Sequence, residues 1–583
     1  MRSHPRPQLT RAHWIDLDGT WQFASDPDDH GLNDRWWEED REFDRTIIVP
    51  FPPESPASGV GETTQRIVWY KKIAEIRRPT TTDRVVLHFG AVDYQADVWV
   101  NGEHVTTHLG GHTSFSVDIT TALSEDGQQA IVVRALDEPD ALDQPRGKQD
   151  WESEPHTIWY RRTTGIWRQV WAEIVPATHI ARLRWTSLTK PGQLRVEAFL
   201  NRPLPGSAIT ISIWLDGDLF HEARLSVSGG EASAILDLRD ARFDSEPDRL
   251  QWTPERPTLF DARVSLEVDG TSIDSIGSYF GLRTVGTSAG HFLLNERPYF
   301  LRLALEQAYW PQSHLAAPSD EAIRREAELI KELGFNGIRM HQTVSDPRFL
   351  FECDRLGLVV WADAPAAYRF SDTALRRTLS EWMDIVQRDA SHPSVIAWVA
   401  FNESWGVPDV ATSTEQQNAV LAAHHLLKAL DPSRLVIGND GWEYVAGDVL
   451  GVHDYTQSPA TVDERYGTRE RAVLTVLEGR PGARTLRVDT AEGPVPPIVL
   501  SEFGGTSFSS REATWNGYGT VCDVEQFVDR VEKLVASVAR AGGLAGFCYT
   551  QLTDTMQERN GLLDEDRQPK APIERLRSAI LGS

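Results

Sequence analysis

The pattern of apolar and polar positions changes twice along the chain. Up to about residue 178, short runs of alternating apolar and polar residues are separated by turn residues, as in the neighbouring runs 85–89 and 96–100. Asn101-Gly102 follows the second run and favours a two-residue hairpin turn, because both positions take positive φ. Alternation with a period of two, without helical patterns between the runs, is typical of an antiparallel sandwich. We therefore predict a β jelly-roll domain over residues 1–178.

A second stretch of alternating runs covers residues 179–285. It opens with "IARLRWTSLTKPGQLRVEAFLN" and closes with "DSIGSYFGLRTVG". About seven strands within roughly a hundred residues are typical of an immunoglobulin-like sandwich. This stretch contains no cysteine, so we expect a sandwich without the inter-sheet disulfide of antibody domains.

After residue 286 the pattern becomes one of strands that alternate with helices. In residues 319–335, Ile323, Ile330 and Leu333 share one face of a helix that starts after Ser319. Further helical segments at 414–430 and 524–541 alternate with short apolar runs such as 395–401. Eight strands alternating with helices are what a barrel requires. The pattern therefore predicts a (β/α)₈ barrel over residues 286–583.

Two of the apolar runs end in a carboxylate. In "VIAWVAFNESWG" Glu403 follows an apolar run almost directly, and in "PPIVLSEFGG" Glu502 does the same. Desolvating an anion is costly unless it is paired or used. The carboxyl ends of parallel barrel strands open onto one face, so we expect the two groups to converge there. Two carboxyl groups at such a mouth can cleave a glycosidic bond, one as acid and one as nucleophile.

Composition and charge exclude some classes of binding partner. The chain has 583 residues and a net charge of −26, which disfavours binding to nucleic acid. No run of 18 apolar residues predicts a membrane span, and the first residues show no apolar signal segment. The three widely spaced cysteines, Cys353, Cys522 and Cys548, favour reduced thiols. We therefore expect a cytoplasmic protein without nucleic-acid or membrane partners.

The motifs "LDGTWQF", "YFGLRTV", "FNESWG" and "SEFGG", in this order, resemble those of glycoside hydrolase family 2, the β-galactosidase/β-glucuronidase family. The resemblance covers nearly the whole chain and implies a retaining, exo-acting β-glycosidase that acts on a carbohydrate without an organic cofactor or a catalytic metal. It implies that Glu403 is the acid/base and Glu502 the nucleophile. Oligomers are common in the family, so a homo-oligomer is among the expected assemblies.

The resemblance also implies roles for residues around the two carboxylates. Asn402 would bind the sugar 2-hydroxyl, Arg339 in "GIRMHQ" would support the nucleophile, and Tyr455 in "VHDYTQ" would hydrogen-bond it. Further candidates for substrate binding, whose alternative role is packing, are His341, Asp440, Trp442, His453 and Tyr549.

The identity of the sugar at the cleaved bond depends on fewer residues. The segment "MQERNGLLDEDRQPK" lacks the Asn-x-Lys motif with which the family's β-glucuronidases hold the sugar carboxylate, and has Glu558, Arg559 and Asn560 instead. The sequence therefore favours a β-D-galactoside. An α-L-arabinopyranoside is the nearest rival, and a β-glucuronide held by Arg559 is a further one.

Two other classes of protein are alternatives to a two-glutamate glycosidase. A non-catalytic carbohydrate-binding protein on the same scaffold would lack one of the two carboxylates, and this chain has both. A metallohydrolase using His341, His453 and Asp454 would need a ligand spacing that the sequence does not show.

Overall fold

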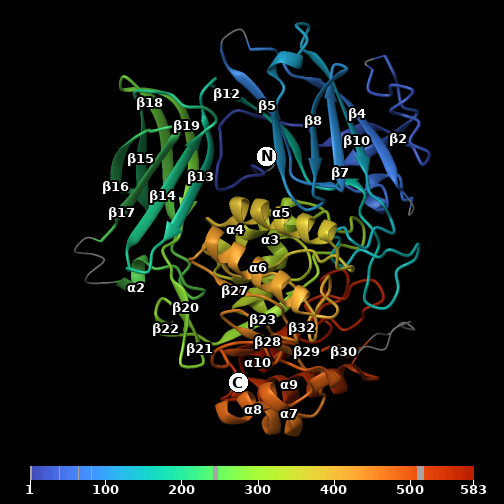
Figure 1. The fold of residues 1–583 in the computed structure, drawn as a ribbon, viewed down its shortest axis with the longest axis vertical. Helices are drawn as coiled ribbons and strands as arrows, with labels where there is room; N and C mark the ends of the chain where they lie inside the picture. Colours follow the sequence, from blue (N-terminus) through green and yellow to red (C-terminus); the bar gives the residue numbers. More distant parts are fainter. Residues whose placement is uncertain are drawn as a thin grey trace.

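The computed structural model describes residues 3–38, 40–62, 65–79, 82–239, 247–508 and 518–582. Figure 1 shows two β-sandwiches, blue and green, packed against a helix-covered barrel that runs from yellow to red. Among the described helices, none is long and apolar enough to cross a membrane. The predicted fold classes, two sandwiches followed by a barrel, are confirmed.

The first sandwich pairs a four-stranded sheet, β1-β12-β5-β9, with a six-stranded sheet, β3-β2-β4-β10-β7-β8. Inward residues such as Trp21, Phe23, Val85 and Val133 are buried because every second side chain of these strands faces the other sheet. The strands are β1 (Trp14–Asp16), β2 (Gly19–Ser25), β3 (Arg45–Val49), β4 (Ile67–Glu75), β5 (Arg84–Phe89), β6 (Val92–Asp93), β7 (Gln95–Val100), β8 (Glu103–Leu109), β9 (Phe115–Asp118), β10 (Gln128–Leu136), β11 (Gly165–Ile166) and β12 (Val170–Val175).

The second sandwich pairs β13-β14-β17 with β16-β15-β18-β19, all antiparallel. Its core includes Trp185, Ile211, Val264 and Phe280. The strands are β13 (Ile180–Ser187), β14 (Gln193–Leu200), β15 (Ser207–Leu215), β16 (Asp218–Ser226), β17 (Glu231–Asp237), β18 (Phe260–Val268) and β19 (Thr271–Phe280), with the short helix α2 (Pro247–Leu250) between β17 and β18. A small sheet, β20 (Val285–Ser288), β21 (His291–Leu294) and β22 (Arg297–Pro298), leads into the barrel.

The barrel consists of eight parallel strands in the order β27-β26-β25-β24-β23-β32-β29-β28. The strands are β23 (Leu301–Glu306), β24 (Gly337–Met340), β25 (Val359–Asp363), β26 (Val395–Val399), β27 (Leu435–Ile437), β28 (Leu450–His453), β29 (Ile498–Gly504) and β32 (Gly546–Thr550). Around them lie α3 (Asp320–Glu332), α4 (Pro347–Leu356), α5 (Asp372–Asp389), α6 (Thr414–Leu430), α7 (Pro459–Tyr466), α8 (Arg469–Glu478), α9 (Val524–Arg540) and α10 (Ile573–Leu581). The short strands β30 (Thr506–Ser507) and β31 (Gly519–Thr520) pair outside the barrel.

Barrel strands are buried on both faces, which explains why their sequences read as continuous apolar runs. All five residues of β26 are buried: Trp398 packs outward against the helices, whereas Ala397 and Val399 belong to the cluster inside the barrel. At α3 the Ser319 hydroxyl accepts a hydrogen bond from the Ala322 N–H, as the predicted helix start requires. The helix predicted over 414–430 is α6.

Candidate active site

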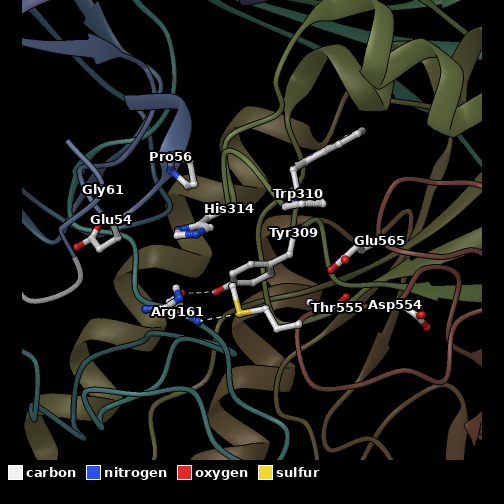
Figure 2. A pocket seen from close by; sticks show the side chains of 12 residues that line it. Glu54, Pro56, Gly61, Arg161, Tyr309, Trp310, His314, Asp554, Thr555 and Glu565 are labelled. Carbon is white, nitrogen blue, oxygen red and sulfur yellow. Dashed lines mark hydrogen bonds between the residues drawn. The ribbon is translucent and has the colours of Figure 1, made fainter. Parts of the chain in front are cut away.

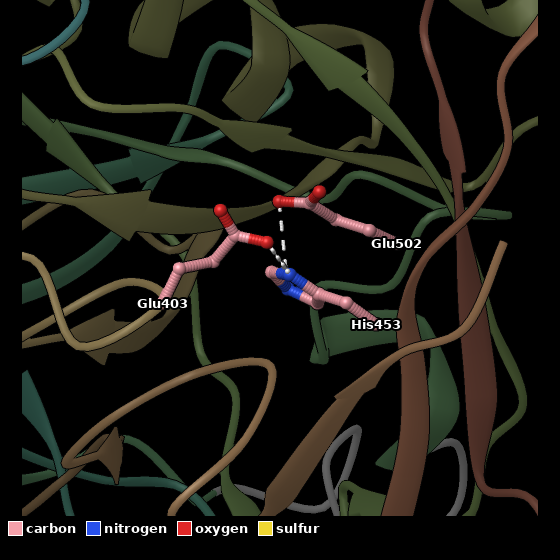
Figure 3. A group of neighbouring side chains, drawn as sticks. All are labelled: Glu403, His453 and Glu502. Carbon is pink, nitrogen blue, oxygen red and sulfur yellow. Dashed lines mark hydrogen bonds and ion pairs between the residues drawn. The ribbon is translucent and has the colours of Figure 1, made fainter. Parts of the chain in front are cut away.

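Glu403 and Glu502 meet at the carboxyl ends of the barrel strands. One oxygen of each, together with a ring nitrogen of His453, lie within 4.8 Å of one another (Figure 3). The Glu502 side chain is 7% exposed and that of Glu403 15%. The two glutamates, about a hundred residues apart in sequence, thus face each other over a gap that one sugar-sized reacting centre can occupy.

The backbone at Glu403 is in an uncommon conformation. Strand β26 ends at Val399, and the loop after it places Glu403 and Ser404 at φ values of 52° and 60°, in the left-handed region. The Glu403 N–H donates to the Asp440 carbonyl at 2.9 Å, and the Ser404 N–H donates to Asn439 Oδ1 at 3.0 Å. Surrounding hydrogen bonds therefore hold a strained turn at the tip of the strand, as is frequent in active sites.

Arg339, at the end of β24, is fully buried and links the acidic groups of the site. Its Nη1 lies 2.9 Å from Glu502 Oε1 and 2.9 Å from Asp440 Oδ2. Its Nη2 donates to Asp363 Oδ2 at 2.8 Å and to Asn402 Oδ1 at 2.7 Å. A buried guanidinium is tolerated only when so paired, and here it orients the side chains that it binds.

Burial and the charge of Arg339 have opposing effects on the pKa values of Asp440 and Asp363, and the balance differs between the two carboxyl groups. Burial tends to raise the pKa of Asp440, but Arg339 and His453 outweigh it and lower that pKa to about 2. At Asp363 burial wins over Arg339, and the pKa rises to about 6. Asp363 is not among the residues predicted from the sequence, although it ends the apolar run "VVWAD" of β25 just as Glu502 follows "PPIVLS". That pattern could have identified it.

His453, at the end of β28, lies between three carboxylates. Its Nδ1 is 2.8 Å from Glu403 Oε1, and its Nε2 is 3.2 Å from Asp440 Oδ2 and 3.4 Å from Glu502 Oε1. Burial favours the neutral ring, but the negative charges of Glu502, Asp440 and Glu403 raise its pKa to about 10. Both nitrogens then carry protons. A metal ion would need one of them unprotonated, so this donor set suits a cationic imidazole better than a metal ligand.

Tyr455, Asn402 and Trp442, three of the candidates from the sequence, lie near the carboxylate pair. The Tyr455 hydroxyl donates to Glu502 Oε2 at 2.5 Å. Asn402 Nδ2 and Trp442 Nε1 are buried and have no hydrogen-bond partner in the part of the chain that the structure describes. Buried donors are normally satisfied, so these two N–H groups are available for the hydroxyl groups of a ligand.

His341 lies beside the nucleophile, whereas Tyr549 does not lie at the wall of the site. His341 Nδ1 is 3.2 Å from Asp363 Oδ2 and 4.0 Å from Glu502 Oε1. Burial and then Arg339 lower its pKa, so this ring is neutral. Tyr549 is fully buried in the hydrophobic core, with its ring edge-on to Phe503 at 5.5 Å. The structure therefore contradicts a role of Tyr549 in substrate binding, because β32 directs its ring into the core.

The first sandwich contributes a segment that the sequence analysis missed. Between β10 and β11, the N–H groups of Arg146 and Gly147 donate to the Ala366 carbonyl at 3.0 and 3.2 Å. The next residue, Lys148, is buried, with Nζ 3.5 Å from Glu558 Oε2 and 5.9 Å from the centre of the Trp405 ring. No local pattern in the sequence indicates that this residue of a sandwich reaches the mouth of the barrel, because its partners there lie far away along the chain.

Of the residues that stand in place of the Asn-x-Lys motif, Glu558 and Asn560 are buried and Arg559 is half-buried. Asn560 Oδ1 accepts from Gln551 Nε2 at 2.9 Å, and Gln551 Oε1 accepts from Gln307 Nε2 at 2.8 Å. Asn560 Nδ2 has no hydrogen-bond partner among the described residues. Arg559, proposed from sequence as a substitute for the lysine, instead pairs with Glu565 at 3.0 Å.

A separate cavity of about 370 Å³ lies between the first sandwich and the barrel (Figure 2). Glu54 and Arg161 line it from the sandwich, and Tyr309, Trp310 and His314 from the barrel. Neither of the paired glutamates lines this cavity. Burial raises the pKa of Glu54 to about 7.

A barrel with paired carboxylates at its mouth is the arrangement expected of a glycoside hydrolase, and the comparisons identify the family. Residues 15–172 match "Glycosyl hydrolases family 2, sugar binding domain", residues 178–283 match "Glycosyl hydrolases family 2", and residues 287–581 match "Glycosyl hydrolases family 2, TIM barrel domain". The chain therefore belongs to glycoside hydrolase family 2, as its motifs indicate.

The most similar proteins differ in the sugars that they are named for. The chain spans about half the length of two bacterial relatives: 55% of a protein of Formosa agariphila, and 45% of the beta-galactosidase of Thermoanaerobacter pseudethanolicus, to which it is 27% identical over 58% of its own length. It is 26% identical to the beta-glucuronidase of Canis lupus familiaris over 97% of this chain and 90% of that protein.

Solved structures show the same fold. Bifidobacterium dentium beta-glucuronidase, complexed with coumarin-3-O-glucuronide, has a TM-score of 0.79 at 19% identity, covering 100% of this chain and 98% of that one. A family 2 beta-galacturonidase from Eisenbergiella tayi has a TM-score of 0.76 with the same identity and coverage.

Proposed function

We propose that this protein is a retaining, exo-acting β-glycosidase. The observation that carries the proposal is the pair Glu403–Glu502, with one oxygen of each within 4.8 Å of the other. Retaining enzymes separate their two carboxyl groups by about 5–5.5 Å, whereas inverting enzymes need about 6.5–9.5 Å to admit a water between carboxylate and sugar.

In the first step Glu502 attacks the anomeric carbon while Glu403 gives a proton to the departing glycosidic oxygen. Arg339 and Tyr455 bind one oxygen each of Glu502 and so aim the carboxylate. In the second step Glu403 takes a proton from water, which attacks the anomeric carbon and releases Glu502. His453 lies between the two glutamates, with Nδ1 2.8 Å from Glu403 Oε1 and Nε2 3.4 Å from Glu502 Oε1, and helps to hold them at this separation.

For the sugar we propose a β-linked hexuronide, the class that includes the β-glucuronide given above as a further rival. Two observations support it. Several relatives that match most of the chain are named beta-glucuronidases. Lys148 supplies a buried ammonium beside Trp405 and Glu558, and His341 is close enough for Lys148 to lower its pKa further. An ammonium in this place can hold the carboxylate of a uronic acid, in the absence of the family's lysine.

The β-D-galactoside that the sequence favours is the second candidate. Glu558, 4% exposed, already pairs with Lys148, and burial followed by the charge of Glu502 raises its pKa. When ionised, Glu558 repels a sugar carboxylate, and its oxygens accept hydrogen bonds from the hydroxyl groups of a neutral sugar instead.

A panel of 4-nitrophenyl glycosides decides between these candidates. We expect kcat/KM to be highest for the β-D-glucuronide or β-D-galacturonide. A preference for the β-D-galactoside or the α-L-arabinopyranoside would transfer the assignment to the second candidate. Turnover of none of these substrates by a folded protein would contradict the proposed function itself.

A further inference from the structure

We propose that the subsite for the leaving group takes an aryl aglycone and consists of four aromatic residues: Trp405, Tyr368, Trp159 and Trp151. We call these four residues the aromatic wall. The inference rests on the proposed function, because a leaving group exists only if the glycosidic bond is cleaved at Glu403.

The wall begins next to the proposed acid. Trp405 is two residues beyond Glu403 in the same strained turn, with the Trp405 N–H donating to the Asn402 carbonyl at 2.9 Å. Its ring centre is 6.2 Å from that of His341, which borders Glu502. The acid must contact the departing oxygen, so a group attached to that oxygen leaves along the Glu403 side of the site. Trp405 thus lies where the sugar ends and the aglycone begins.

The other three rings extend outward from Trp405. Its ring centre is 5.3 Å from that of Tyr368 and 6.3 Å from that of Trp159, both tilted by about 40°. Trp151 lies 4.7 Å from Trp159 and 5.0 Å from Tyr368. All four side chains are half-buried, so part of each ring surface is open to solvent. Four adjoining aromatic side chains that remain partly open to solvent next to the proposed acid are a candidate surface for ligand contact.

Hydrogen bonds between the two domains hold the wall in place. Trp159 Nε1 donates to the Tyr368 hydroxyl at 2.7 Å, and that hydroxyl donates to the Gly147 carbonyl at 2.6 Å. Gly147 has a φ of 60°, and a Cβ there would lie 2.0 Å from the Gln342 carbonyl oxygen, so only glycine permits this close approach. The rings are therefore pre-organised before any ligand arrives.

The same hydrogen bonds select the chemistry of the ligand. Trp159 Nε1 and the Tyr368 hydroxyl are occupied within the wall, so the wall offers a ligand ring faces and, as polar side-chain groups, the indole N–H groups of Trp405 and Trp151. A second sugar would need hydrogen bonds for its hydroxyl groups at this place, and an aryl group needs only a stacking surface. The geometry therefore points to an aromatic leaving group.

The test compares leaving groups on one sugar, namely whichever sugar the panel above identifies. For Trp159→Leu and Trp151→Leu, we expect kcat/KM for the 4-methylumbelliferyl glycoside to fall about ten-fold, a typical value for the loss of an aromatic contact. For the glycosyl fluoride, whose leaving group is too small to touch the wall, kcat/KM should stay within about two-fold. Trp159→Phe keeps an aromatic ring but loses the Nε1 hydrogen bond to Tyr368, so its loss with the aryl glycoside should be smaller than that of Trp159→Leu.

Trp214→Leu is the matched control, because it makes the same change on β15 of the second sandwich. Equal losses with both substrates in the wall variants would mean that the wall only supports the active site, and would overturn the proposal. A larger loss with a disaccharide than with the aryl glycoside would overturn the aryl assignment in favour of a sugar. Failure of the unaltered protein to cleave even the fluoride would contradict the proposed function, which is a different outcome from an unchanged ratio.

Discussion

The two sandwiches contact the barrel at opposite ends of its strands. The first sandwich sends the segment between β10 and β11 to the carboxyl end, where Gly147 binds the loop after β25. The second contacts the amino end: Arg283 donates to the carbonyls of Pro393 and Val395, where β26 begins, and the Tyr279 hydroxyl donates to Asp354 Oδ2 at 2.8 Å. Catalytic groups of such barrels gather at the carboxyl end, whereas the amino end serves stability. Two domains of the same class therefore have different tasks because of where they contact the barrel.

The largest expected effect lies in the barrel itself. Glu502→Gln should lower kcat by about 10⁴-fold or more, because it removes the nucleophile. Thermal unfolding should change little, since the glutamine Oε1 can still accept from Arg339 and its Nε2 can donate to the Tyr455 hydroxyl oxygen. Glu403→Gln should slow glycosides with poor leaving groups far more than activated aryl glycosides, as a general acid contributes about 10²–10⁴-fold. Appreciable turnover by Glu502→Gln would place the nucleophile elsewhere.

The next effect concerns the stability of the first sandwich at its contact with the barrel. The pKa of Glu54 is about 7 in the folded protein, whereas the ordinary value for a glutamate side chain, which applies to the unfolded chain, is 4.5. The folded protein thus binds more protons between these values, and its free energy of unfolding falls as pH rises from about 4.5 to 7, by about 3 kcal/mol in total. Glu54→Gln should remove this contribution.

Denaturant unfolding at pH 5 and pH 8 measures the contribution of Glu54. The variant should gain stability relative to the unaltered protein at pH 8 and not at pH 5. Arg→Gln or Glu→Gln changes on the surface, such as Glu222→Gln on the exposed face of β16, serve as controls. The same difference at both pH values would contradict the argument.

A smaller effect is expected from the residue that the first sandwich delivers to the site. Lys148→Met should raise KM for a β-hexuronide by about 10- to 100-fold, since a hydrogen bond to a charged group is worth about 1.5–3 kcal/mol. The galactoside should be affected much less, and Lys148→Arg should keep the preference for the uronide. If Lys148→Met weakened both sugars equally, Lys148 would be a structural residue and the hexuronide assignment would lose its support.

The smallest effect is expected at the second sandwich. Tyr279→Phe removes one hydrogen bond to Asp354, whose carboxylate keeps His392 Nδ1 at 2.6 Å and the Ser394 N–H at 2.8 Å. The free energy of unfolding should fall by about 1 kcal/mol. Because this contact lies at the amino end of the barrel, kcat/KM should stay unchanged. A loss of activity without a loss of stability would show that the two ends of the barrel are coupled.

The amino-acid sequence by itself determined the three domains and the carboxylate pair. Periods of two and of 3.6 residues are local consequences of strand and helix geometry, and so they mark the sandwiches and helices such as α6 directly. Glu403 and Glu502 could be found because each follows a strand, and parallel strands bring such positions to one face. The same reasoning would have identified Asp363.

Only the tertiary structure decided which residues surround that pair. Lys148 and Trp159 come from another domain, and their approach depends on a close contact at Gly147 that no periodicity records. Tyr549 is adjacent in sequence to the residues of the barrel mouth, yet its side chain points into the core. A strand position reveals the end of the barrel at which a residue lies, but not its contacts, because these depend on elements far away in the sequence.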